Sequence, residues 1–558
     1  MNRVMGWKGI VLGFGLVAVL AACAGESGSE PDTTAPTVSS TRPADGASGV
    51  AQNVMISAAF SEAMDGTGID DTSFTLSSAN GGAVGGTVRF DGRTATAYLM
   101  PSAPLQGQTE YIASLAGTIT DSAGNALAPT SWRFTVGSRG WGNAEIIDAA
   151  SVNVTTPRVA MDAGGNAVAV WEQEGDIWAA RYLAGAGWQA PVAIEESAFF
   201  AWGPEVAVAA NGDAVVVWQQ DETDTASGNL YSHVLARRFT AGGGWGAPAY
   251  MEDDVAVSSY SAHVAMDASG NALVAWVRDA GLLGGSAIWA NRYQSGSGWQ
   301  GAEAVNDTMG MNPRVAFDAD GNGLLTWWEI GLNGGSTIWA SRHLPASGWQ
   351  TVTAVASSAE EVLSFPQLAL DADGNAFVVW EQYGMSSSGS SVWVNRYTAA
   401  GGWGSPQSLG QDSQGSHSSP AIAMNANGNA AVAWVYDDRN IMVIRARRYS
   451  PGGDWSAAET ISAGVGNADS PQLGLDDAGD ILVVWTEGDF DGRFSAWASR
   501  YAGSGGWAGA GLIENAGGDV EPLSAPRVAV DPSNGNAIAV WGQDAGGTRF
   551  EVWSNRFE

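Results

Sequence analysis

The chain of 558 residues is poor in several residue types on which common chemistries depend. It has one cysteine, so it cannot form an intramolecular disulfide. Lys8 is the only lysine, and it lies in a segment that we expect to be removed, so no residue is a candidate for Schiff-base chemistry. The four histidines are far apart, and neither an HExxH nor a GxSxG motif occurs. The sequence therefore singles out no catalytic residue, metal ligand or cofactor.

Basic residues are scarce as well. The 25 lysines and arginines against 58 acidic residues give a formal net charge of −33 at pH 7. Such a chain repels nucleic acid, so we expect no nucleic-acid partner. Helical periodicity is also missing, whereas the chain has 75 glycines, 26 tryptophans and frequent Gly/Asn turns. This composition predicts an all-β protein.

What the sequence has in abundance is one repeat, represented by residues 157–189, which returns up to the last residue. Each copy contains an apolar run, such as NAVAVW, that ends in a tryptophan. There are eight such tryptophans: Trp171, Trp218, Trp276, Trp327, Trp380, Trp434, Trp485 and Trp541. Their spacing of 47 to 58 residues is typical of a four-stranded propeller blade. We interpret each copy as strand, turn, strand, loop, strand, turn and strand.

The two ends of the repeat series predict how the propeller closes. A fourth strand at residues 140–147 precedes the first complete copy, whereas the last copy stops after its third strand at Glu558. We therefore expect the N-terminal strand to complete the last blade, with Trp141 beside the sheet of Trp553. Residues 140–558 are thus predicted to form an eight-bladed β-propeller closed by its N-terminal strand.

The N-terminus predicts an export signal. Arg3 and Lys8 precede an apolar segment, residues 10–20, that is too short for a mature membrane helix. The sequence Leu-Ala-Ala-Cys that ends at Cys23 resembles the lipobox of bacterial lipoproteins. The resemblance implies that residues 1–22 are a lipoprotein signal peptide and that Cys23 is lipidated. It also implies a protein of the cell envelope. Ala24, where lipoproteins retained in the inner membrane have an aspartate, favours anchoring to the outer membrane, on the periplasmic face or the cell surface. Residues 23–34 have the composition of a flexible tether.

A separate domain is predicted at residues 35–137. Short alternating strands and turn signals such as DSAGN, residues 121–125, indicate a β-sandwich. The segments PADGA, FSEAMD and the closing DSAGN and WRFTV resemble the bacterial Ig-like domain of the SbsA type. In that family such domains are spacers or adhesive stalks, and no catalytic residue is carried over.

The propeller has its own partial resemblances. The DxxGNxxxxW pattern resembles the Asp-box of sialidases (BNR-like repeats) and the tryptophan-docking motif of quinoprotein dehydrogenases, but the nine residues from Asp162 to Trp171 exceed the spacing of both. A lipidated eight-bladed propeller also resembles an outer-membrane assembly factor. The turn at Asp318 fits a calcium-loop pattern, yet it leads into a buried strand, so we expect the turn carboxylates to bond their own backbone.

An arginine recurs in the third strand of every copy. We expect these residues to be structural and to bond the turn carboxylates or carbonyls. They are Arg181, Arg238, Arg292, Arg342, Arg396, Arg448, Arg500 and Arg556.

Positions that differ between copies are where function is expected. One set begins the inner strands, after a proline in seven copies, and we expect it near the mouth of the central channel, where its arginines could hold an anion: Arg158, Glu205, His263, Arg314, Gln367, Ala421, Gln472 and Arg527. A second set lies in the connections between blades, where apolar residues are mixed with acids: Phe199, Phe200, Trp202, Tyr250, Tyr260, Met309, Met311, Phe365, Glu195, Glu196, Glu252, Asp253, Asp254, Glu360 and Glu361. An apolar surface rimmed by acids suits a protein or glycan partner, and anchoring of these loops to the propeller is the alternative.

These features predict a monomeric binding or adhesion module of the cell envelope. Its propeller would bind a protein or a glycan with the loop face, and the Ig-like domain would be a spacer. The alternatives are a glycan-active hydrolase or lyase and a scaffold of outer-membrane assembly. An enzyme needs convergent titratable groups in a deep pocket, whereas a binding protein can use a shallow, aromatic-rich one.

Overall fold

The computed structural model describes residues 32–148, 153–195, 197, 199–224, 228–253, 257–279, 285–331, 335–384, 389–411, 415–488, 492–503, 506–514, 518–544 and 549–558. Cys23, the predicted signal peptide, Glu196 and Asp254 lie outside these residues. Within them the helical segments are two short 3-10 turns, η1 (Gly66–Gly68) and η2 (Pro522–Ser524), so the all-β prediction is confirmed. In the same residues we find no helix with the length and apolarity needed to span a bilayer.

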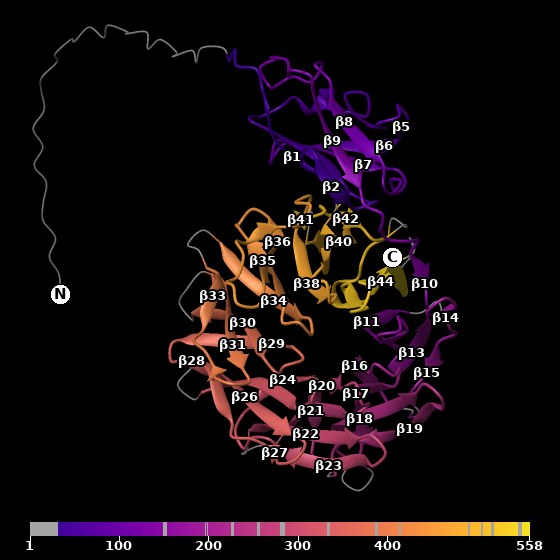
Figure 1. Cartoon of the computed structure of the whole chain (residues 1–558), viewed down its shortest axis with the longest axis vertical. Helices are drawn as coiled ribbons and strands as arrows, with labels where there is room; N and C mark the ends of the chain where they lie inside the picture. The colour runs from indigo at the N-terminus through magenta and orange to yellow at the C-terminus, as the bar shows by residue number, and fades with distance from the viewer. Residues whose placement is uncertain are drawn as a thin grey trace, which may run out of the picture.

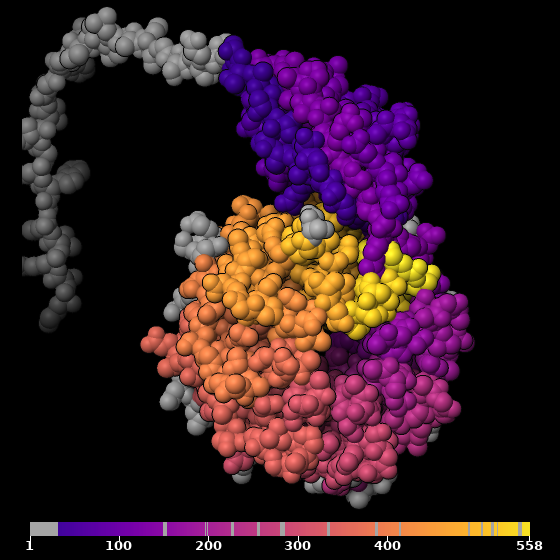
Figure 2. Space-filling view, viewed as in Figure 1, coloured from indigo at the N-terminus to yellow at the C-terminus, as the bar shows by residue number. Residues whose placement is uncertain are grey.

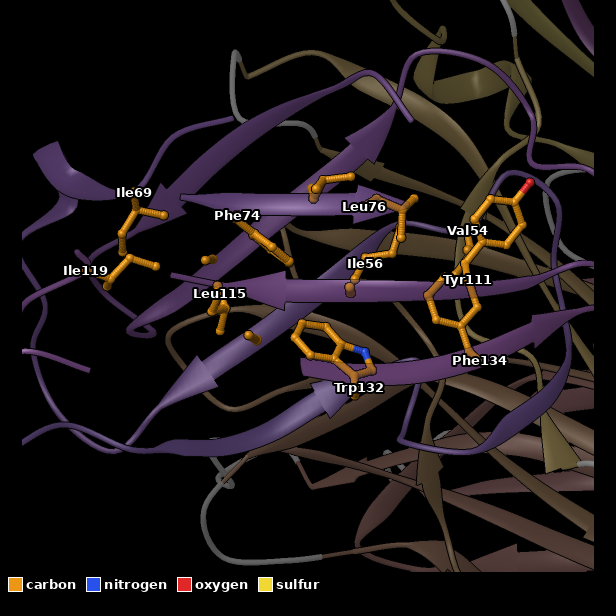
Figure 3. Close-up of a cluster of buried hydrophobic side chains, with 14 of the residues drawn as sticks. Val54, Ile56, Ile69, Phe74, Leu76, Tyr111, Leu115, Ile119, Trp132 and Phe134 are labelled. Atoms are coloured by element: carbon orange, nitrogen blue, oxygen red, sulfur yellow. The ribbon is translucent and has the colours of Figure 1, made fainter. Parts of the chain in front are cut away.

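The N-terminal domain is a sandwich of two sheets. One has the strand order β1 (Val38–Arg42), β3 (Ile56–Phe60), β7 (Thr96–Pro101), β6 (Gly86–Asp91). The other has the order β2 (Ala47–Val50), β9 (Thr130–Val136), β8 (Glu110–Leu115), β4 (Phe74–Ser78), β5 (Ala83–Val84). Figure 3 shows the core between them, where the rings of Phe74 and Trp132 have centroids 5.8 Å apart. Alternating buried positions in β8 produce this packing, as expected for strands with one face in the core.

The described residues that follow form eight further sheets of similar topology. Their innermost strands are β11 (Val154–Met161), β16 (Ala201–Val208), β20 (Ser259–Met266), β24 (Met311–Phe317), β29 (Glu361–Leu370), β34 (Ser416–Met424), β38 (Ala468–Leu475) and β43 (Arg527–Val530). The second strands, which carry the repeated tryptophans, are β12 (Ala167–Gln173), β17 (Ala214–Thr223), β21 (Ala272–Asp279), β25 (Gly323–Ile330), β30 (Ala376–Gly384), β35 (Ala430–Asp437), β39 (Ile481–Gly488) and β44 (Ala537–Asp544).

The outer half of each sheet consists of a third strand and shorter edge strands. The third strands are β13 (Asp176–Leu183), β18 (Leu230–Thr240), β22 (Ser286–Gln294), β26 (Ser336–Leu344), β31 (Ser390–Thr398), β36 (Met442–Tyr449), β40 (Phe494–Ala502) and β45 (Phe550–Phe557). The edge strands are β14 (Gly187–Trp188), β15 (Val192–Ala193), β19 (Gly244–Tyr250), β23 (Gly298–Ala304), β27 (Gly348–Trp349), β28 (Thr353–Ser358), β32 (Gly402–Trp403), β33 (Gln407–Gly410), β37 (Glu459–Thr460), β41 (Gly506–Trp507), β42 (Gly511–Leu512) and β10 (Glu145–Ile146).

The eight sheets are arranged in a ring (Figure 1). Each innermost strand contacts the next one along the chain, and β43 contacts β11, which closes the circle. The closing sheet takes its outer strand from the N-terminal side, because β10 pairs with β45 and Ile146 lies opposite Trp553. Trp141 also bridges to Phe557, with ring centroids 5.6 Å apart. The predicted closure by the N-terminal strand is therefore what the structure has.

The repeated tryptophans form the core between neighbouring sheets. All eight are completely buried. A buried indole N–H needs an acceptor, and in most sheets the second residue along the strand supplies it. Trp171 Nε1 donates to Gln173 Oε1 at 3.2 Å, and Trp485 Nε1 donates to Glu487 Oε2 at 2.9 Å. The sequence pattern W-x-Q/E thus satisfies six of the eight tryptophans within their own strands. Trp434 donates to His417 of the innermost strand instead, and Trp276 Nε1 has no hydrogen-bond partner among the described residues.

Seven of the eight third-strand arginines join their sheet to the next one. Arg181 stacks on the ring of Phe239 with its Cζ 4.1 Å from the centroid, and Arg556 stacks on Tyr182 at 5.5 Å, which carries the pattern across the closure. The same arrangement pairs Arg238 with Tyr293, Arg342 with Tyr397, Arg396 with Tyr449, Arg448 with Tyr501 and Arg500 with Phe557. These arginines are structural, as expected. They act mainly by cation–π stacking between sheets rather than by bonding to turn carboxylates.

The turn carboxylates are mostly occupied by their own turns. Asp162 Oδ1 accepts the backbone N–H groups of Gly164 and Asn166, each at 2.8 Å, as the sequence predicts. Of the turn aspartates proposed as arginine partners, Asp318 bonds Arg342 at 3.1 Å. Arg238 and Arg500 instead bond Asp213 and Asp480, which take the place of the turn asparagine in their sheets. The turns therefore need no cation to account for their acidity.

The Ig-like domain packs against the outer edge of the ring beside β41 and β42 (Figure 1). Val54 bridges to Gly511, and the Tyr98 hydroxyl donates to the carbonyl of Gly464 at 3.3 Å. Met55 and Tyr98 share a buried apolar cluster with Ile461 and other propeller residues. The domain therefore lies beside the ring and leaves its centre uncovered.

Candidate functional site

A β-bulge interrupts seven of the eight innermost strands at the same point. In each of them the pairing register shifts just before the residue that follows the proline or, in β20, Ala262. The residue before that proline or alanine has a positive φ: Thr156 (51°), Gly203 (63°), Ser261 (56°), Asn312 (48°), Phe365 (52°), Ser419 (51°) and Ser470 (55°). In the eighth sheet, Ala525 has φ −51° and β43 begins after the turn η2. Bulges redirect the side chains that follow them, so this feature sets which residues face the axis.

The residues that follow the bulges line one central cavity of about 530 Å³. Figure 2 shows the centre of the ring hollowed at this point. Seven of the eight variable inner-strand residues are on its wall, and Ala421 is not. The full lining is Arg158, Val159, Glu205, His263, Arg314, Phe365, Gln367, Glu381, Ser419, Pro420, Ser470, Pro471, Gln472, Arg527 and Val528.

Three guanidinium groups dominate the polar part of this wall. Arg158 Nε bonds Glu205 Oε1 at 3.0 Å, and about a quarter of each of these side chains stays open to the cavity. Arg314 Nε donates to Gln367 Oε1 at 3.4 Å. The buried Nε of Arg527 has no hydrogen-bond partner among the described residues. Buried donors without a partner are rare, so Arg527 is the side chain on this wall most in need of an acceptor.

The electrostatics of the cavity follow from this enclosure. Burial raises the pKa of Glu205, but Arg158, His263 and Arg314 outweigh it and hold that pKa at about 2. Burial and then Arg314 lower the pKa of His263 to about 4, so this histidine is neutral at pH 7. Burial, followed by the charge of Arg158, lowers the pKa of Arg527 to about 9, which still leaves it charged. Burial also raises the pKa of Glu381. Three arginines and two glutamates line the cavity, so its lining is basic in an acidic chain.

Of the predicted loop aromatics, the structure brings Phe365 to the cavity wall. Phe199 and Phe200 are 44% and 53% exposed and do not line it. Trp202 and Tyr260 are half-buried next to the bulges of β16 and β20, and the Tyr260 hydroxyl lies 3.2 Å from Ser286 Oγ. These residues therefore do not form one aromatic site with Phe365.

Two of the described acids of the loop set are buried, which agrees with the alternative that these loops are anchored to the propeller. Glu252 is buried, where it accepts the N–H of Val234 at 3.1 Å and contacts His233 Nδ1 at 3.1 Å. Glu195 is buried as well and accepts the N–H of Ser197 at 2.8 Å. Because buried carboxylates need such partners, these two residues anchor their loops to the propeller.

Three polar side chains of the cavity were missed by the reasoning from the sequence. Ser419 and Ser470 occupy the bulge position next to the proline, the position that Phe365 has in β29. Glu381 directly follows the buried Trp380, and its Oε2 accepts the N–H of Ser419 at 3.3 Å. The signal was available, because the residue after the repeated tryptophan varies between copies whereas the tryptophan does not.

Comparison with known proteins identifies the first domain only. No curated protein matches the chain. Among solved structures it is similar to a protein of unknown function from Dyadobacter fermentans, at 10% identity, covering 75% of this chain and 98% of that one with a TM-score of 0.39. It is also similar to an ulvan lyase, a polysaccharide lyase, at 10% identity over 61% and 92% with a TM-score of 0.42. A third is the intramolecular trans-sialidase from Ruminococcus gnavus, at 10% identity over 61% and 92% with a TM-score of 0.34. Similarities this low carry no argument about function. Residues 32–136 match the family model described as bacterial Ig-like domain, so the resemblance predicted for this part of the chain is confirmed.

Proposed function

We propose that this protein is a binding module of the cell envelope whose propeller holds an anionic group of a protein or glycan ligand in the central cavity. The observation that carries the proposal is that Arg158, Arg314 and Arg527, from three separate sheets, line one cavity in a chain of net charge −33. Guanidinium groups bind carboxylate, sulfate and phosphate through paired, charge-assisted hydrogen bonds. The unpartnered Nε of Arg527 adds a donor that such a group would satisfy.

The test is a triple substitution of the three cavity arginines. In the whole chain, R158A/R314A/R527A should lose anion binding, as measured by calorimetry with an acidic glycan and an acidic peptide and by capture of envelope components. The matched control is R93A/R133A/R439A, which removes three arginines that lie away from the cavity. If the cavity variant binds as the unsubstituted protein does, the central cavity is not the binding site.

A glycan-active hydrolase or lyase is the second candidate function, because titratable groups converge in the same cavity. His263, Glu205 and Glu381 all line it. A histidine that is neutral at pH 7 can act as a general base, and burial raises the pKa of the Glu381 carboxyl, which is the direction that favours a general acid. Mass spectrometry of acidic oligosaccharides after incubation with the protein separates the two functions. Shortened products that disappear in H263Q and E381Q would favour the enzyme, and intact oligosaccharide favours the binding module.

The location of the module is part of the proposal. We propose that Cys23 carries the lipid, that the protein is held at the outer membrane and that the Ig-like domain is the spacer between membrane and propeller. The lipobox sequence before Cys23 supports the anchor. In cells fed a clickable palmitate analogue, the protein should be labelled and sediment with outer membranes, and C23S should be unlabelled. Label on C23S, or an inner-membrane fraction, would contradict this part.

A further inference from the structure

Phe365 has a backbone conformation that is unusual for its side chain. Its φ of 52° lies in the left-handed region, where a bulky residue is a rare outlier. The equivalent residues of the other bulged strands are all smaller: Thr156, Gly203, Ser261, Asn312, Ser419 and Ser470. The Phe365 ring is nevertheless 56% exposed and lines the cavity. Strained residues of this kind cluster at ligand sites, and burial of the ring does not account for this one.

The Phe365 ring has a rigid support. Its centroid lies 6.2 Å from that of Trp328, with 47° between the ring planes. Trp328 is buried in β25, the second strand of the preceding sheet. The contact between neighbouring sheets holds the Phe365 ring in place while more than half of its surface stays open. An aromatic ring held in this way is a stacking platform.

The groups beside this platform indicate what stacks on it. Gln367, two residues further along β29, accepts a hydrogen bond from Arg314 on the same wall. Glu381 and Ser419 supply further acceptors and donors there. A ligand that uses all of them needs an apolar face, an acidic group and several hydroxyls. The pyranose ring of an acidic sugar combines an apolar C–H face with hydroxyls and a carboxylate or sulfate.

The charge of the whole chain limits how many acidic groups the ligand can carry. A polyanion would bring its other charges near a surface of net charge −33, which repels them at low ionic strength. One acidic residue can instead enter the cationic cavity by itself. Resting on the anion-binding function proposed above, we infer that the cavity binds a single acidic sugar residue of an otherwise neutral glycan. Its ring stacks on Phe365, and its acidic group bonds Arg314 and Arg527.

Calorimetry on the whole chain tests this inference with four probes. They are a neutral oligosaccharide that ends in one glucuronic acid, the same oligosaccharide without the acid, an oligomer of galacturonic acid and inorganic sulfate. The singly acidic oligosaccharide should bind at least tenfold more tightly than the neutral one. At low ionic strength it should also bind more tightly than the galacturonic acid oligomer, and added salt should reduce this difference in affinity.

Substitutions of Phe365 separate the sugar platform from the anion site. F365A should weaken binding of the singly acidic oligosaccharide about tenfold and leave sulfate binding unchanged. F365W, which keeps an aromatic ring, should bind the oligosaccharide as the unsubstituted protein does. The control is F494A, because Phe494 is an exposed phenylalanine of β40 that does not line the cavity.

Unchanged oligosaccharide binding in F365A overturns the inference, as does tighter binding of the polyanion at low salt or binding of an acidic peptide in place of every saccharide. Those outcomes leave the anion-binding function intact as long as R527Q weakens binding of the ligand that remains about tenfold. If the unsubstituted protein binds neither sulfate nor any acidic ligand, the proposed function itself fails.

Discussion

Two sets of arginines in the propeller have the same side chain and opposite surroundings. The third-strand arginines occur in every repeat, and seven of the eight lie on an aromatic ring of the next sheet, as Arg448 does on Tyr501 at 3.8 Å. The cavity arginines, Arg158, Arg314 and Arg527, occur in three repeats and face open space. The arginine that every repeat contains is held by ring stacking in seven of the sheets, although the Nε atoms of Arg238, Arg292, Arg396 and Arg448 have no hydrogen-bond partner among the described residues. An arginine that only some repeats contain has hydrogen-bond donors available for a ligand.

The largest effect is expected where the ring of sheets closes. Arg500 stacks on Phe557, and Trp141 packs against the same ring. W141A removes a buried side chain and should lower the free energy of unfolding by about 3–5 kcal/mol. Urea denaturation followed by tryptophan fluorescence measures it. The control is W188A, because Trp188 is the equivalent residue of a sheet formed by one continuous segment. The two variants should lose similar free energies of unfolding if the closing strand is bound as firmly as the outer strands of the other sheets. A negligible loss would mean that the ring does not depend on this strand.

A single stacked arginine should cost less. R448A removes the stacking on Tyr501 and the hydrogen bond to its hydroxyl, which together are worth about 2 kcal/mol. R448K should recover little, because an ammonium cannot stack as a planar guanidinium does. The urea midpoints of the two variants measure the loss of stability. Anion binding should be unchanged in both. If R448A is as stable as the unsubstituted protein, the stacked arginines do not stabilise the fold.

The cavity set should show the reverse effect. R527Q should weaken anion binding about tenfold, the usual contribution of one charge-assisted hydrogen bond at about 1.5 kcal/mol. Its stability should change by less than about 0.5 kcal/mol, because the lost Nε has no partner in the described structure. Calorimetry and urea denaturation on the same preparation measure both quantities. A large loss of stability would place Arg527 with the structural arginines.

The smallest expected effect is a dependence of stability on pH. The pKa of His263 is lowered from 6.5 to about 4, so the folded protein binds this proton less readily than the unfolded chain. Stability that depends on neutral His263 is complete above pH 6.5 and is lost as the pH falls toward 4. H263Q should therefore flatten the decrease of the melting temperature over this range. Parallel curves for the two proteins would show that His263 is not held neutral by the cavity.

Much of the fold could be predicted because contacts within one sheet follow from spacing along the chain. The repeated tryptophans fix the second strands, and the unmatched strand before Trp171 fixes the closure. The same logic identified the wall of the cavity from the one inner-strand position that varies, which Arg158 occupies in the first repeat.

Contacts between sheets were harder to predict, because they depend on the angle at which the ring closes. The stacking of Arg181 on Phe239, the approach of Glu381 to Ser419 and the packing of Met55 against Ile461 all join separate sheets or domains. The positive φ of Phe365 was equally hidden, since a proline after it does not by itself indicate a bulge. Nor does spacing tell whether a loop carboxylate such as Glu252 points outward or into the protein.

The pairing of β10 with β45 also affects how the protein is made. β10 is synthesised before the other strands of the propeller and β45 after them. While synthesis continues, the seven intermediate sheets can form in order, but the circle cannot be completed until β45 has been made. A variant without β45 would leave the eighth sheet open, with unpaired strand edges available for aggregation.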